Sequence, residues 1–372
     1  MAAADLAGLQ HLVLWAAFAV AVAFGALTQS SGFCTMGAVS DVVAMGEWTR
    51  MRQWALAAAV ATLGFAVLAA TGAVRAPQTL YASTRWLWLS ALVGGALFGF
   101  GMVLSSGCVS RNLVRLGAGS LKALVVAIVT GIAAFATLKG LTAVWRVNSV
   151  DRVNVEFGAN SDVATLLAHG AGLAPATASL LAGSVVGLLL LVFALASAQA
   201  RRPRNLLAGA GVGALVLAMW WITGHLGHLA EHPETLEEAW LATNSTRAEG
   251  LSFVGPAAYS LDWLMFFSDA GKRLTVGIVS VPGVIVGAAA MALARGRFRW
   301  EGFRSTRDLG QHLAGAALMG VGGVTALGCS IGQGVTGLST LSLTSFVAAG
   351  AMVAGAAAGV RYQMRRVAGD EG

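Results

Sequence analysis

Residues 94–114 read GGALFGFGMVLSSGCVSRNLV, and residues 315–335 read GAALMGVGGVTALGCSIGQGV. At an offset of 221 residues, nine of the 21 positions are identical, including a Gly-Cys pair in each copy. Each copy is an apolar, glycine-rich run that breaks at this Gly-Cys pair. Small residues allow helix backbones to pack closely within a membrane. The two stretches therefore predict a pair of transmembrane helices that each end at a cysteine.

The composition of the whole chain supports a membrane protein. Of 372 residues, 57% are hydrophobic and 11% are charged, whereas soluble domains carry about 25% charged residues. These values exclude an ordinary soluble enzyme and a disordered chain. The net charge of +7 does not indicate nucleic-acid binding, because most basic residues lie between the apolar runs.

Apolar runs of about 20 residues are long enough to cross a bilayer as helices. We predict an all-α polytopic fold that forms a single transmembrane domain over residues 1–372. Residues 29–45 and 253–267 are apolar but short or interrupted by polar residues, so we expect re-entrant or interfacial helices there. The nine predicted spans are 9–28, 53–74, 86–105, 119–140, 177–199, 205–224, 273–294, 310–327 and 337–360.

The basic residues predict the orientation of the chain. One set of alternate loops and ends carries 16 Lys and Arg residues and the other set carries eight. Because cytoplasmic loops are enriched in Lys and Arg, we expect the N-terminus outside and the C-terminus in the cytoplasm.

The repeated stretches end the third and eighth predicted spans, so they would run in opposite directions. Inverted repeats, here covering roughly residues 9–140 and 205–360, are typical of secondary transporters whose substrate site lies where the repeats meet. The alternative interpretation is a packing motif that both helices share.

Three cysteines, Cys34, Cys108 and Cys329, all lie where an apolar run breaks. Buried cysteines often act as small hydrophobic residues, but packing cysteines should be scattered through helix interiors. Helix breaks expose backbone N–H groups, which favour anions, and a neutral thiol is a weak donor that suits a soft acceptor such as sulfur. We therefore predict an anion path lined by three protonated thiols.

Further residues near the cysteines are candidates for supporting this path. Arg111 either attracts a dianion or marks the cytoplasmic side. Asn112 and Gln333 occupy equivalent repeat positions and either face the path or seal helix ends. The supporting glycines are Gly32, Gly107, Gly328, Gly332 and Gly334.

Two other patterns suggest functions that we set aside. Residues 332–337 match G-x-G-x-x-G, but an apolar helix precedes them and no acidic residue follows until Asp370, so they do not indicate nucleotide binding. His225, His228 and His232 would share one face of a helix and could bind a metal ion. We prefer a polar, outward-facing segment, because no cysteine or carboxylate cage accompanies them. We expect no metal and no cofactor.

Several motifs resemble the YeeE/YedE sulfur-transport family: GFCTMGAVSD at 32–41, SSGCVSRNL at 105–113 and GCSIGQG at 328–334. The resemblance covers nearly the whole chain and implies nine spans plus re-entrant helices in an hourglass shape. It also implies thiosulfate import across a bacterial inner membrane through S–H···S hydrogen bonds to the three cysteines, and a separate cytoplasmic sulfur-carrier protein as a possible partner. At residues 253–255, where the second half should match Cys34, the sequence is Phe-Val-Gly and carries no thiol.

The leading prediction is a transporter of thiosulfate or a related sulfur anion, not an enzyme. Alternatives within this class are transport of a selenium oxyanion, sulfide or sulfite. Alternatives from other classes are a membrane thiol oxidoreductase and a structural membrane scaffold.

Overall fold

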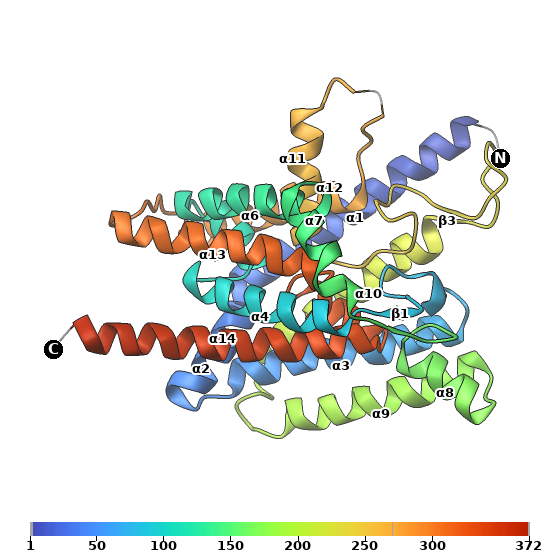
Figure 1. Ribbon diagram of the computed structural model, residues 1–372, viewed down its shortest axis with the longest axis horizontal. Coiled ribbons are helices and arrows are strands. Elements are labelled where there is room, and N and C mark those ends of the chain that lie inside the picture. Colours follow the sequence, from blue (N-terminus) through green and yellow to red (C-terminus); the bar gives the residue numbers. More distant parts are fainter. Residues whose placement is uncertain (1–2, 270, 371–372) are drawn as a thin grey trace.

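The computed structural model describes residues 3–269 and 271–370, which form a bundle of long helices (Figure 1). Each predicted span coincides with one long helix. These helices are α1 (Ala3–Ser31), α3 (Thr49–Ala70), α4 (Trp88–Leu104), α6 (Leu121–Lys139), α9 (Pro175–Leu195), α10 (Pro203–Trp221), α12 (Val276–Ala294), α13 (Thr306–Thr325) and α14 (Leu343–Asp370).

Short elements connect the long helices. The short α-helices are α2 (Thr35–Met45), α5 (Val109–Gly117), α7 (Leu141–Asn148), α8 (Val163–Ala171) and α11 (Val254–Met265). The others are the 3-10 turns η1 (Ala76–Gln78) and η2 (Val150–Arg152), and the π-helices η3 (Ile222–Leu226) and η4 (Gly332–Gly337). Strands β1 (Arg85–Trp86) and β2 (Val155–Glu156) pair antiparallel, as do β3 (His228–Leu229) and β4 (Ala239–Trp240). The helices α2 and α11 are the two short helices predicted at 29–45 and 253–267.

Eight helical segments within the described residues are long and apolar enough to cross a membrane. The remaining predicted span, 310–327, is α13, whose first half carries Asp308 and His312. This helix packs against α4 and α6. The architecture is therefore an all-α polytopic membrane protein, and α13 lies among its other helices.

The last span begins later than predicted. We expected it to start at residue 337, but α14 begins at Leu343. Residues Gly332–Gly337 form the π-helix η4 before it, and Leu341 adopts a φ of 58° that a right-handed α-helix does not permit. The glycine-rich sequence after Cys329 thus forms an irregular segment before the final helix.

Glycines set the closest contacts of the bundle. A Cβ atom added at Gly94 would lie 2.7 Å from the carbonyl oxygen of Gly322, and one added at Gly101 would lie 2.7 Å from that of Gly315. The start of α4 therefore packs against the end of α13, and the end of α4 against its start, so the two helices are antiparallel. Their backbones approach this closely because none of these residues carries a side chain.

The outer surface of the bundle suits a lipid environment. Leu189 and Val192 of α9 are 66% and 69% exposed, and many other large apolar side chains are also exposed. The first and last described residues lie at opposite ends of the long axis (Figure 1). The basic loops at residues 295–304 and the last turns of α14 share one end, which we call the arginine-rich face.

Candidate functional site

All three cysteines lie at the start of a helical segment. Cys34 is the N-cap residue of α2 and Cys108 that of α5, while Cys329 precedes η4. The Sγ atom of Cys34 accepts the N–H of Gly37 at 3.4 Å, and that of Cys329 accepts the N–H of Gly332 at 3.3 Å. The N-terminal N–H groups of α2 and of the segment leading into η4 therefore point toward a thiol.

The fold brings the three thiols together. Cys108 lies close enough to both Cys34 and Cys329 to interact with each of them. Cys108 and Cys329 are almost fully buried, and all three are free thiols. Two hydroxyl groups flank this row, since Ser110 Oγ lies 3.3 Å from Cys108 Sγ and Ser252 Oγ lies 3.9 Å from Cys329 Sγ. Cys108 thus interacts with both of the other cysteines, which come from distant parts of the sequence.

The two Gly-Cys breaks have the same backbone geometry. Ser106 and Leu327, which are 221 residues apart, have φ angles of 55° and 58°. The N–H of Gly107 donates to the carbonyl of Met102 at 2.8 Å, and Gly328 donates to Gly323 at the same distance. Each break therefore turns the chain through a left-handed residue that is not glycine, a strained conformation that persists only where the surroundings enforce it.

Several predicted supporting glycines allow close packing around the thiols. A Cβ atom at Gly332 would lie 2.5 Å from Ser252 Oγ, and one at Gly334 would lie 2.6 Å from the Trp54 ring. Gly32 has a φ of 75°, which only glycine adopts readily. At Gly107 and Gly328 an added Cβ would press at 3.2 Å and 3.1 Å on the side chains four or five residues later.

The amides at the equivalent repeat positions bond to backbone. Asn112 Nδ2 donates to the carbonyls of Gly107 and Cys108 at 2.8 and 3.1 Å. Gln333 donates to the carbonyl of Ala326 and accepts from the hydroxyl of Ser345. Of the two roles that the sequence left open, the structure favours sealing of the helix breaks, because both amides use their donors on carbonyls there.

The two arginines after Cys108 differ in their contacts. Arg111 lines a small cavity of about 10 Å³ together with Cys34, Thr35 and Ser110, and its Nη1 lies 3.5 Å from the Thr28 carbonyl. Arg115 instead bonds to the Ser106 carbonyl and pairs with Glu301. Of these two arginines, Arg111 is therefore the one that adds positive charge beside a cysteine.

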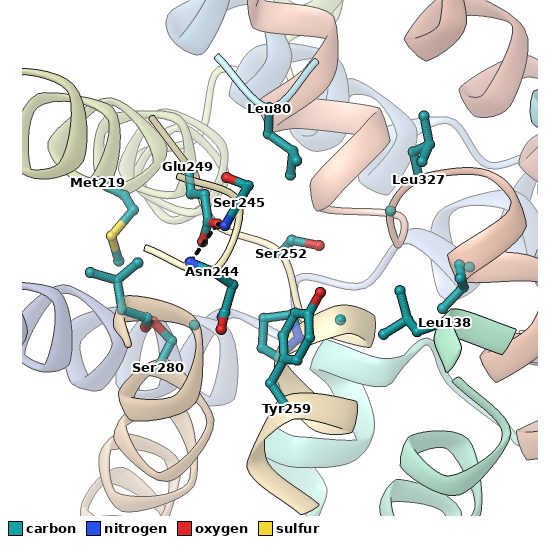
Figure 2. Close-up of a pocket in the computed structure, with 18 residues that line it drawn as sticks. Leu80, Leu138, Met219, Asn244, Ser245, Glu249, Ser252, Tyr259, Ser280 and Leu327 are labelled. Atoms are coloured by element: carbon teal, nitrogen blue, oxygen red, sulfur yellow. Dashed lines mark hydrogen bonds between the residues drawn. The ribbon is translucent and has the colours of Figure 1, made fainter. Parts of the chain in front are cut away.

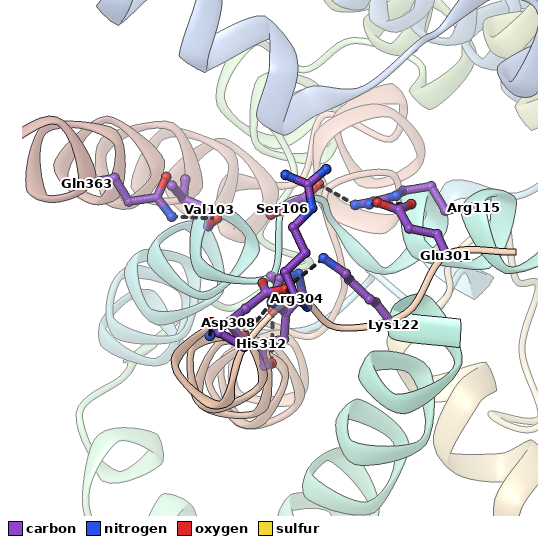
Figure 3. Close-up of polar contacts among 11 residues, drawn as sticks. Val103, Ser106, Arg115, Lys122, Glu301, Arg304, Asp308, His312 and Gln363 are labelled. Carbon is purple, nitrogen blue, oxygen red and sulfur yellow. Dashed lines mark hydrogen bonds and ion pairs between the residues drawn. The ribbon is translucent and has the colours of Figure 1, made fainter. Parts of the chain in front are cut away.

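The arginine-rich face also carries a polar cluster (Figure 3). Lys122 Nζ pairs with Asp308 Oδ2 at 2.7 Å, and the Lys122 side chain is only 8% exposed. His312 contacts Asp308 as well, and Gln363 donates to the Val103 carbonyl at the end of α4. These contacts fix α6, α13 and α14 relative to the break at Cys108.

A larger cavity lies on the other side of the cysteine row. It has a volume of about 150 Å³ and reaches Gly328 and Ser252 beside Cys329. Its walls come from α10, α11, α12, α13 and the loop at residues 244–252. Figure 2 shows Ser252 at its centre, with the Tyr259 hydroxyl pointing into it and Glu249 on one side. We call this cavity the vestibule.

The sequence reasoning did not single out several residues that the fold places here. Tyr81 donates its hydroxyl to the Gly332 carbonyl at 2.6 Å, and Ser252 and Glu249 lie in the loop before α11. The buried Phe253 is the N-cap residue of α11, as Cys34 is of α2. Ser252 and Glu249 lie in the polar stretch TNSTRAEGLSFVG at 243–255, just before the predicted short helix at 253–267, and this change in polarity could have pointed to them.

The described residues contain no cluster of three or more His, Cys, Asp or Glu side chains placed to hold a metal ion. Of the three histidines of the 225–232 segment, His228 bonds to Glu238 at 2.7 Å, His225 packs against Trp221 and His232 accepts the N–H of Glu234.

A family model and two relatives match this chain over most of its length. The family model described as sulphur transport matches residues 30–358. A protein named thiosulfate transporter TsuA from Spirochaeta thermophila is 26% identical over 347 residues, which cover 90% of this chain and 94% of that protein. Another of the same name, from Escherichia coli, is 25% identical over 321 residues, which cover 84% of this chain and 83% of that protein.

Proposed function

This chain belongs to the sulphur transport family, and we propose that it imports thiosulfate through a path lined by Cys34, Cys108 and Cys329. It is a membrane transporter and not an enzyme, so the thiol oxidoreductase considered from the sequence is set aside. The names of its two relatives support thiosulfate as the substrate.

One observation carries the proposed path. The three free thiols form a row in which Cys108 interacts with both of the others, and the vestibule and the small cavity of Arg111 lie at the two ends of this row. A neutral thiol donates weakly to the terminal sulfur of thiosulfate, while helix N-termini and Arg111 attract its charge. Each thiol can then pass the anion to the next with a low free-energy barrier.

The direction of transport follows from the proposed topology. The N-terminus and the vestibule face the outside, and the arginine-rich face lies in the cytoplasm of a bacterial inner membrane. In the cytoplasm, a sulfur-carrier protein would receive the imported thiosulfate. The small inner cavity holds at most about one water molecule, so release to the cytoplasm requires the segment around Cys34 to move.

We also propose that the two halves are inverted repeats. The glycine contacts support this proposal, because Gly94 meets Gly322 and Gly101 meets Gly315. In the sequence repeat Gly94 corresponds to Gly315 and Gly101 to Gly322, so the two contacts are exchanged by a twofold axis. The cysteine row would lie close to this axis.

The test of this function is growth of bacteria that lack their own thiosulfate importers, with thiosulfate as the sole sulfur source. The chain should restore growth, and purified protein in liposomes should accumulate ³⁵S-thiosulfate. Excess sulfite, sulfide or selenite should compete weakly. Strong uptake of one of these anions without thiosulfate uptake would reassign the substrate within the class.

A further inference from the structure

Glu249 is a buried carboxylate in the wall of the vestibule. Glu249 is 8% exposed, and it lies on the loop that leads to Ser252 and α11. In the described parts of the chain, no basic side chain forms an ion pair with it. A negative group is unexpected on the route of a dianion toward Cys329, and the path described above does not use it.

The contacts of Glu249 do not require its charge. Its Oε1 atom accepts the N–H groups of Asn244 at 2.9 Å and Ser245 at 2.7 Å (Figure 2). A neutral carboxyl group or an amide can accept the same two hydrogen bonds through its C=O oxygen. The loop can therefore keep its shape whether Glu249 is charged or neutral.

The surroundings of Glu249 favour its neutral form. The titratable groups that interact with it are the phenols of Tyr81 and Tyr259, and Cys329 lies beyond Tyr81. None of these carries positive charge. The nearest arginine in the sequence, Arg247, directs its guanidinium to the Ala82 carbonyl at 2.7 Å.

Charges further along α11 do not change this conclusion. Asp262 contributes negative charge near Tyr259 and is itself paired with Lys272. Burial raises the pKa of the Glu249 carboxyl by more than the hydrogen bonds from Ser245 and Asn244 lower it, since desolvation disfavours the charged form. An arriving dianion adds two more negative charges and favours protonation further.

We propose that Glu249 is a proton-binding site coupled to substrate entry, so that the vestibule takes up thiosulfate together with one proton. This inference rests on the proposed function and deepens it by naming the ion that accompanies the anion. Since coupling is reciprocal, bound thiosulfate tightens proton binding at Glu249, and protonated Glu249 tightens thiosulfate binding. A sodium ion is the alternative partner for a carboxylate, and the test below includes it.

The sign of the pH dependence follows directly. Below its pKa Glu249 is neutral and the vestibule admits the dianion, so uptake is high. As the outside pH rises through the raised pKa, Glu249 ionises and uptake falls, by about tenfold for each further pH unit.

The experiment measures initial ³⁵S-thiosulfate uptake into liposomes that contain the full-length protein, at outside pH values from acidic to alkaline. Wild-type uptake should fall with rising pH and should not require sodium. Glu249→Gln keeps the acceptor for Asn244 and Ser245 but cannot ionise, so its uptake should be high and independent of pH. Glu238→Gln alters another carboxylate of the same outer region and should retain the wild-type profile.

A second measurement gives its main result on the wild-type protein, which does not depend on how the variant folds. Calorimetry of thiosulfate binding to wild-type protein, in two buffers with different ionisation enthalpies, should show uptake of about one proton per anion. Glu249→Gln should bind with no proton uptake.

Several results would overturn the inference: pH-independent wild-type uptake, binding without a proton, a sodium requirement that Glu249→Gln abolishes, or a folded but inactive Glu249→Gln. Thiosulfate uptake with any of these results leaves the proposed function intact. If no protein takes up thiosulfate at any pH, the proposed function fails and this inference fails with it.

Discussion

Replacement of Cys108 by alanine is the most direct test of the thiol row. Cys108 is 1% exposed and interacts with both other thiols, so its replacement removes the thiol that the other two share as a neighbour. A hydrogen bond to a charged group contributes about 1.5–3 kcal/mol. If transit loses this amount at one step, uptake slows by about 10- to 150-fold, since each 1.4 kcal/mol changes a rate tenfold.

The assay is initial ³⁵S-thiosulfate uptake into liposomes, measured beside the thermal unfolding of each variant. We expect Cys34→Ala and Cys329→Ala to behave like Cys108→Ala. A serine at these positions keeps a hydroxyl donor that is smaller and harder than a thiol, so serine should retain some activity at one or two of the three positions.

A matched control separates transport from packing. Val126 is fully buried on α6, outside the thiol row, and Val126→Ala removes more volume than Cys108→Ala does. We expect Val126→Ala to lower stability by about 0.5–3 kcal/mol while leaving uptake near normal. If all three alanine variants transport normally, or lose activity only in proportion to their stability, the cysteines are packing residues and the path hypothesis is refuted.

Three further predictions concern topology and packing. A reporter enzyme that works only in the cytoplasm should be active when fused to the C-terminus. Activity of a reporter that works only in the periplasm would reverse the assigned orientation. Gly99→Val should lower the free energy of unfolding in detergent by about 3 kcal/mol, because its Cβ would collide with the Met352 carbonyl, whereas Gly310→Ala meets no atom within 4 Å and should be tolerated. Lys122→Ala should cost about 2 kcal/mol by leaving Asp308 without its cation, and an unchanged melting temperature would show that the pair contributes nothing.

Much of the architecture could be predicted because it depends on local properties of the chain. Hydropathy and glycine content identify helices that can cross a membrane, and all nine predicted spans coincide with long helices. The helix breaks at Cys34, Cys108 and Cys329 could also be predicted, because the change from apolar to polar or glycine-rich sequence is visible without any tertiary contact.

Other features could not be predicted because they depend on contacts between distant segments. Sequence left Asn112 and Gln333 with two possible roles, and only the position of the broken helix ends shows that their amides bond to carbonyls there. The last helix starts six residues later than predicted, because the chain turns at Leu341, with a φ of 58°, and hydropathy does not reveal such a turn.

The sequence by itself determined that this is a helical membrane protein with a repeated Gly-Cys break, since both follow from composition and order along the chain. Only the tertiary structure decided which groups meet. It brought Cys108 into interaction with both Cys34 and Cys329, and it put Glu249 and Ser252 in the wall of one vestibule. The physical reason is that these side chains are far apart in the chain and converge only when glycine-lined helices such as α4 and α13 pack at close range.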